Sequence, residues 1–201
     1  KDKLFERAEK LRLSEEGKGA ENECLKLYKL AAEAGHGQAC YRLARIYQDG
    51  VLVGRDLRKA AEYFKYAARK GDVRACFRLA EMHLYGDGVE QDFEQAYQMA
   101  LKAAQQDFSP AMNLIGRFHR KGLHVSQSDA LACDWYQKSF WRGNADGAHN
   151  LAAMYRRGLG RPRNPELSKY LEDAANRIRS GARIEDVLSD TPALLRSERR
   201  T

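Results

Sequence analysis

Proline and long apolar runs are scarce in this sequence. It has 4 prolines among 201 residues, and no stretch approaches the roughly 18 consecutive apolar residues that a membrane-spanning helix requires. Alanine, leucine, lysine, arginine, glutamate and glutamine are abundant instead, and these side chains lose little conformational freedom in a helix. The sequence therefore predicts an all-α protein without a transmembrane span.

Cysteine and histidine are also few, and their spacing excludes the usual metal motifs. None of the 5 histidines stands four residues from another, as a helical zinc motif needs. The 4 cysteines indicate buried, inert thiols or a reducing compartment. We therefore expect no metal, no cofactor and no catalytic site. The cytoplasm is the expected location, with a periplasmic or secreted location as the alternative if a signal segment has been removed.

Small and apolar residues recur every 36 positions. The small residues that open each unit are Ala39, Ala75, Ala111 and Gly147. Each is followed by apolar residues at the spacing of one buried helical face. Glycines that can end this first helix follow at Gly50, Gly86, Gly122 and Gly158, and residues that can cap a second helix follow at Asp56, Asp92, Ser128 and Asn164. Because one helix pair cannot bury its apolar face alone, the period predicts an α/α superhelical solenoid of stacked helix-turn-helix repeats.

The repeat divides the chain into three regions. Residues 1–20 fit it poorly and are expected to form a capping helix around Leu4, Phe5, Ala8 and Leu11. Helix pairs are expected over residues 21–178: a partial pair at 21–37, then full pairs at 38–73, 74–109, 110–145 and 146–178. Residues 179–201 are expected to contain a short amphipathic helix with Ile184, Val187 and Leu188, followed by a loose polar tail.

The second repeat carries a family resemblance. Ala75, Leu79-Ala80, Met82, Gly86-Asp-Gly88-Val89 and Asp92 are similar, almost position by position, to the Sel-one-like repeat (SLR) family of the tetratricopeptide-like superfamily. The resemblance implies a right-handed superhelix with a concave face, a role as a protein-binding adaptor or scaffold, and no enzymatic activity. In cysteine-rich members, partners of Cys40 and Cys76 stand where this chain has Ala32 and Ala68, so the resemblance implies no disulfide here.

The outward residues of the first helices are expected to line the concave groove. They are Tyr41, Arg42, Arg45 and Gln48; Phe77, Arg78, Glu81 and Leu84; Asn113, Arg117 and Arg120; and His149 and Arg156. Separately, Trp141 of a second helix is predicted to be an exposed interface anchor, because it is aromatic at an otherwise polar repeat position. The guanidinium group of arginine can donate two parallel hydrogen bonds to a carboxylate. We therefore predict a protein or peptide partner with acidic character. The alternatives are a merely solvated arginine face, and a Trp141 that packs on Phe140 or on the C-terminal helix.

Two other functions are left open. Related bacterial repeat proteins act as immunity or inhibitor partners of secreted toxins, so the resemblance allows that role. The net charge of +7 does not by itself indicate nucleic-acid binding. The basic tail with Arg156, Arg157, Arg161 and Arg163 suggests it, but acidic residues are interleaved with the basic ones, which makes it the less favoured reading. The apolar residues of the C-terminal segment also suggest that this segment could fold back into the groove.

Overall fold

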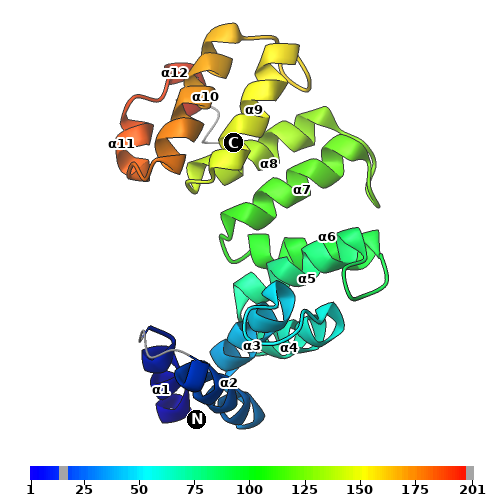
Figure 1. Ribbon diagram of the computed structural model, residues 1–201. Helices are drawn as coiled ribbons and strands as arrows, with labels where there is room; N and C mark the ends of the chain where they lie inside the picture. Colours follow the sequence, from blue (N-terminus) through cyan, green and yellow to red (C-terminus); the bar gives the residue numbers. More distant parts are fainter. Residues whose placement is uncertain (14–17, 198–201) are drawn as a thin grey trace. The chain divides into compact units, whose positions relative to one another are not determined.

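The computed structural model describes residues 1–13 and 18–197 (Figure 1). Within these ranges it contains twelve α-helices and no strand, which confirms the all-α prediction. The chain divides into two compact units, Lys1–Met99 and Ala100–Thr201. No described helix is long and apolar enough to cross a membrane.

The helices of the first unit are α1 (Asp2–Leu13), α2 (Lys18–Glu33), α3 (Gly37–Asp49), α4 (Leu57–Arg69), α5 (Val73–Tyr85) and the start of α6 (Phe93–Ala104). In this unit α1 packs on α2, α2 on α3, α3 on α4 and α4 on α5. Ala8 of α1 is fully buried in one cluster with Tyr28 of α2 and Leu43 of α3. Residues 2–13 therefore form a helix that pairs with α2 and shares its core.

The second unit continues the same arrangement. After the end of α6 come α7 (Ser109–Lys121), α8 (Asp129–Trp141), α9 (Ala145–Arg157), α10 (Pro165–Arg179), α11 (Ile184–Ser189) and α12 (Ala193–Ser197). Along the chain α7 packs on α8, α8 on α9 and α9 on α10. Tyr136, Phe140, Leu151, Met154 and Leu171 form the large buried side chains of its core.

The predicted helix boundaries are confirmed at the atomic level. A side-chain oxygen accepts the amide three residues later, at 2.9 to 3.2 Å, at all four predicted N-caps: Asp56, Asp92, Ser128 and Asn164. The four glycines that end the first helices all have left-handed backbone, with φ between 65° and 77°. Small side chains and caps thus set the 36-residue spacing of the helices.

The prediction of a loose tail after α11 is wrong for residues 193–197. These residues form α12, and Leu195 is completely buried in the core of the second unit together with Val187 of α11. The Tyr170 hydroxyl of α10 donates to the Val187 carbonyl at 3.0 Å, which ties α11 to the last repeat. Val187 and Leu195, two of the apolar residues that suggested a segment entering the groove, are therefore buried against the last repeat instead. Residues 198–201 lie outside the described part.

Candidate partner-binding site

A pocket of about 730 Å³ lies in the first unit, among α1, α2, α3 and the loop that follows α3. Three residues predicted for the groove, Tyr41, Arg42 and Arg45, line it. Two arginines that were not predicted, Arg12 of α1 and Arg74 of α5, also line it. The pocket thus gathers four guanidinium groups from three helices.

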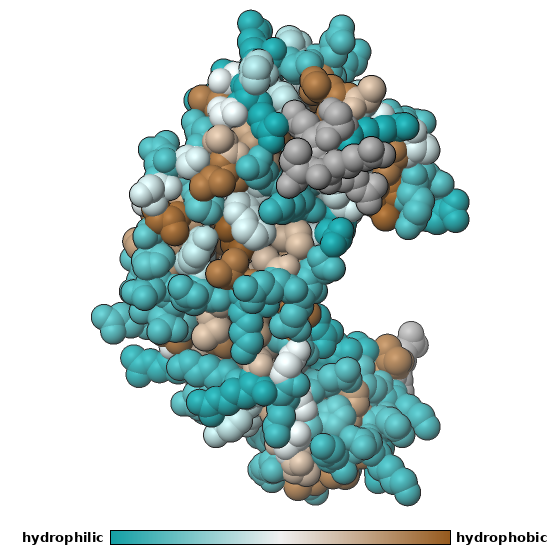
Figure 2. Space-filling model, turned by 180° about the vertical axis from the view of Figure 1, so that it is seen from behind, coloured by the Kyte–Doolittle hydropathy of each residue, from teal (hydrophilic) through white to brown (hydrophobic). Residues whose placement is uncertain are grey.

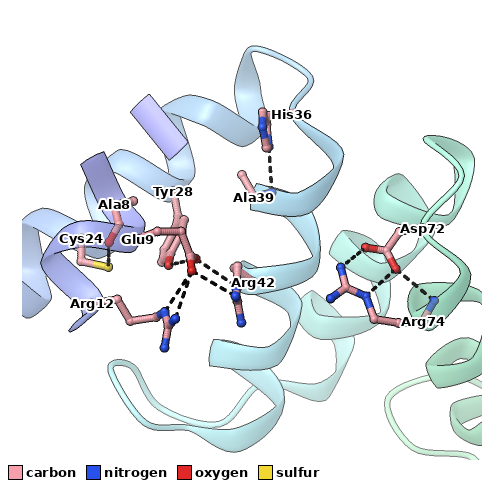
Figure 3. Close-up of polar contacts among 10 residues, drawn as sticks. All are labelled: Ala8, Glu9, Arg12, Cys24, Tyr28, His36, Ala39, Arg42, Asp72 and Arg74. Atoms are coloured by element: carbon pink, nitrogen blue, oxygen red, sulfur yellow. Dashed lines mark hydrogen bonds and ion pairs between the residues drawn. The ribbon is translucent and has the colours of Figure 1, made fainter. Parts of the chain in front are cut away.

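Glu9 holds two of these arginines in place (Figure 3). Its carboxylate accepts from the guanidinium of Arg12 at 3.0 Å, from that of Arg42 at 2.9 Å, and from the hydroxyl of Tyr28 at 2.5 Å. Partial burial works to raise the pKa of Glu9, but these three donors outweigh it and lower the pKa. Glu9 is therefore an ionised anchor that joins α1 to α2 and α3.

The other two arginines are each held by an acid of their own. Arg45 donates Nε and Nη2 to Asp49, at 3.2 and 2.9 Å. Arg74 donates Nε and Nη2 to Asp72, at 3.1 and 2.6 Å, and its guanidinium lies 4.2 Å from the centre of the Tyr41 ring. The two ion pairs and the ring contact fix the orientation of both groups while leaving Nη1 of each outside these pairs.

The loop after α3, residues 50–56, differs from the other loops between paired helices. The third residue after the helix has left-handed backbone in those loops: Gly88 (φ 71°), His124 (φ 62°) and Gly160 (φ 69°). In the first loop this position is Leu52, which does not have a positive φ.

A hydrogen bond is missing from the same loop. The amides of Asp87, Leu123 and Leu159 donate back to carbonyls five residues earlier, at 3.0 to 3.1 Å. In the described part of the chain no such bond runs from Val51, although the loop still closes through Asp56 N–H to the Tyr47 carbonyl.

The glycines in the other loops allow a close approach that Leu52 cannot make. A Cβ on Gly88 would lie 2.3 Å from the backbone carbonyl of Leu57 at the start of α4, and one on Gly160 would lie 2.3 Å from that of Asp129 at the start of α8. The corresponding partner of Leu52 in the repeat is Glu21, near the start of α2. Leu52 and Glu21 both line the pocket, so the pocket occupies the place where the loops with Gly88 and Gly160 approach a helix closely.

The remaining predicted residues of the first unit lie outside this pocket's lining. Arg78 donates to Glu81 at 2.9 Å and lies over the Phe77 ring at 5.8 Å, all within α5. Gln48 is half-buried, and Leu84 is buried, so Leu84 offers little surface to a partner. A role for these five residues in binding stays a prediction.

In the second unit the predicted residues fall into separate contacts. Asn113 accepts from the Asn150 side chain at 2.8 Å. Arg117 and Arg120 are half-buried near the Tyr136 phenol, whose pKa is raised by burial and lowered in part by these two cations.

At the end of this unit His149 and Arg156 are exposed, and Arg156 forms an ion pair with Glu172 at 2.5 Å. Arg161 pairs with Asp134 at 2.6 Å. Two of the four arginines that suggested nucleic-acid binding are therefore neutralised by acidic neighbours, and the partner-binding role of His149 and Arg156 stays a prediction.

Trp141 is half-buried and packs on Phe140, with ring centres 5.3 Å apart. It also lies against the core cluster that contains Val187 and Leu195 of the C-terminal helices. This packing agrees with the alternative given for Trp141 from the sequence. Its role as an interface anchor stays a prediction.

The residues that could carry chemistry are mostly inside the core. All four cysteines are buried and none of them is in a disulfide, and burial raises the pKa of Cys24 and Cys40, which disfavours the reactive thiolate. Among the described residues no group of three His, Cys, Asp or Glu side chains could hold a metal ion. On the face shown in Figure 2, hydrophilic residues dominate and apolar ones form small separate patches.

Comparison with known proteins identifies the family. The Sel1 repeat model matches residues 15–36, 37–72, 73–108, 109–140 and 145–171. The chain therefore belongs to the Sel1 repeat family, whose members generally mediate protein–protein interactions and are generally not enzymes. No curated protein matches the chain at a significant level.

Solved structures with the same fold come from several bacteria. A protective antigen of uropathogenic Escherichia coli with an SLR fold is 30% identical, with a TM-score of 0.71 over 77% of this chain and 33% of that one. A Sel1 repeat protein from Oxalobacter formigenes is 23% identical, with a TM-score of 0.73 over 79% and 65%. An immunity protein from Pseudomonas aeruginosa is 20% identical, with a TM-score of 0.52 over 95% and 86%. The chain thus spans a third of the first relative and about two thirds of the second.

Proposed function

We propose that this chain is a scaffold that binds a partner protein, without catalytic activity of its own, through the arginine-rich face of its first helices. The observation that carries the proposal is the pocket in the first unit, which brings Arg12, Arg42, Arg45 and Arg74 together in fixed orientations. Membership of a family that generally mediates protein–protein interactions supports the same reading. Guanidinium groups favour carboxylates, so we propose acidic character for the partner segment.

The arginines do not behave as a freely solvated helix face. Each of the four forms an ion pair, and the acids that hold them come from the same helix for Arg12 and Arg45, but from another helix for Arg42. Held side chains lose less conformational entropy when they bind, so their contribution to affinity is larger than that of free surface arginines. Arg45 and Asp49 are both more than a third exposed, so their ion pair adds little to stability, which leaves recognition as the more telling role for Arg45.

The test is affinity capture from nuclease-treated lysate with matched variants. The pocket variant carries Arg→Gln at 42, 45 and 74, and the control carries Arg→Gln at the exposed positions 55, 58 and 69 of the same unit. We expect the original chain and the control to retain the same protein and the pocket variant to lose it. Circular dichroism checks that all three chains are equally helical. Retention that ignores the pocket substitutions would contradict the proposal.

The immunity role belongs to the Pseudomonas aeruginosa protein that is named for it. At 20% identity the similarity shows a shared fold and no more, so we make no immunity proposal for this chain. A partner that is captured from untreated lysate but lost after nuclease treatment would instead point to nucleic acid. The affinity of the chain for nucleic acid would then fall steeply with salt.

A further inference from the structure

We propose that the pocket beside the first loop, residues 50–56, is an anchor site for a peptide that carries an aliphatic side chain next to a carboxylate. This inference rests on the proposed function, because it specifies the chemistry that the scaffold would recognise. It follows from the combination of an apolar wall, a set of oriented arginines and a local departure from the repeat.

The apolar wall comes from two directions. Leu11 and Ile46 contribute from α1 and α3, and Val51 and Leu52 contribute from the loop. Val51 has 75% of its surface exposed, so it offers apolar area that a ligand can remove from water. An aliphatic side chain of a peptide would cover this wall.

The charged side of the pocket is oriented in advance. In all four arginines the carboxylates of the protein hold the Nε and Nη2 edge, through Glu9, Asp49 and Asp72. The Nη1 groups are outside these pairs, and a guanidinium can serve two acceptors at once because it has five N–H donors. A carboxylate of the peptide would therefore add to the existing pairs without breaking them.

The charge of the lining explains why an acid alone is not enough. Glu21 and Asp49 line the pocket together with the four arginines, so the attraction for an anion is partly offset. A purely acidic segment gains only this reduced attraction, and a purely apolar one leaves the guanidinium groups without a new acceptor. A ligand that offers both groups on neighbouring residues satisfies both sides of the pocket.

The size of the pocket limits the ligand to a short segment. Pockets of about 300 to 1,000 Å³ are typical of sites that enclose a small molecule. At about 730 Å³ this pocket can take a few residues in extended form, such as one acidic and one aliphatic residue with their backbone. We therefore place an anchor dipeptide here, with the rest of the partner outside the pocket.

The test uses three blocked hexapeptides and the full chain. The first is acetyl-Gly-Gly-Leu-Asp-Gly-Gly-amide; in the second Gly replaces Leu, and in the third Asn replaces Asp. Binding is followed by NMR from the arginine Nε–H signals and the backbone amides of residues 50–54. We expect the first peptide to shift the signals of Arg42, Arg45 and Arg74, and each control peptide to bind about tenfold more weakly.

Leu52→Ala is the decisive variant. It keeps the Cβ that prevents the loop from approaching the helix, so it should leave the pocket and the helical content unchanged while removing part of the apolar wall. We expect this substitution to weaken the binding of the Leu-Asp peptide about tenfold and to leave the binding of the Gly-Asp peptide unchanged. Arg55→Gln, at an exposed residue of the same loop, is the control and should change neither affinity.

The outcomes separate this inference from the proposed function. Equal binding of the Leu-Asp and Gly-Asp peptides, or no shift at millimolar peptide, overturns the anchor site. If capture of a partner protein still depends on the three pocket arginines in that case, the scaffold function stands without the anchor. If capture also ignores those arginines, both proposals fail.

Discussion

Two glycines in the loop after α5 give a direct test of the close helix–loop approach. Gly86 and Gly88 both have left-handed backbone, with φ of 77° and 71°. A Cβ on Gly86 would find its nearest neighbour at 3.5 Å, on the flexible Gln91 side chain, whereas one on Gly88 would lie 2.3 Å from the Leu57 carbonyl. Alanine would therefore cause the same backbone strain at both positions, but only at position 88 would it also clash with the Leu57 backbone.

The expected magnitudes follow from these two terms. Left-handed backbone costs a non-glycine residue about 1–2 kcal/mol, which is the whole effect expected for Gly86→Ala. Overpacking against a backbone that cannot rotate away adds about 1–3 kcal/mol, so Gly88→Ala should lower the free energy of unfolding by about 2–5 kcal/mol.

Urea unfolding followed by circular dichroism measures the difference. The midpoint for Gly88→Ala should lie about 1 M below that for Gly86→Ala, with the same dependence on urea, since the surface exposed on unfolding is unchanged. Equal midpoints for the two variants would refute the close approach, and with it the explanation given for the pocket at Leu52.

Two further predictions concern the ends of the chain. Glu9→Gln should lower the free energy of unfolding by about 1–2 kcal/mol at neutral pH, because it removes the charge that Tyr28, Arg12 and Arg42 share. The pKa of Glu9 is lowered in the folded chain, so this stabilisation is present above the unfolded pKa of about 4.3 and lost as the pH falls through the folded pKa; a difference between the chains that stays constant down to acid pH would contradict it. At the other end, Leu195→Ala should cost about 2–5 kcal/mol in urea unfolding because its side chain is fully buried. The exposed neighbour Leu194 is its control, with a change within about 0.5 kcal/mol, and similar losses at both positions would place α12 outside the core.

The repeat architecture could be predicted because its signals are local. The helices α3, α5, α7 and α9 end at a glycine, and α4, α6, α8 and α10 begin at a capping side chain. Both signals depend on about one turn of chain. Small residues repeat where helices touch, so the register follows from the sequence alone. The prediction for the tail was wrong because the position of α12 depends on a single buried residue, Leu195. A single residue gives no repeating pattern that could be recognised in the sequence.

The pocket required the structure because its partners are far apart in sequence. Glu9 and Arg42 are 33 residues apart, and the region that contains Glu9 fits the repeat poorly. Arg74 lies at the start of a first helix, before the residues expected to face the groove. One signal was visible: Leu52 replaces the second glycine of the repeat. Its meaning depends on knowing that this glycine touches the preceding second helix.

The segment after α10 carries a shortened copy of the repeat. Val187 stands 36 residues after Leu151 and is buried as Leu151 is, so α11 corresponds to a further first helix that ends after six residues. Together with α12 it covers apolar surface of the helix pair α9 and α10. Because repeats contact mainly their neighbours, an extra 36-residue unit placed between α10 and α11 would meet surfaces of the kind that it already fits. The number of helix pairs before α11 can therefore change by whole repeats while α11 and α12 are kept.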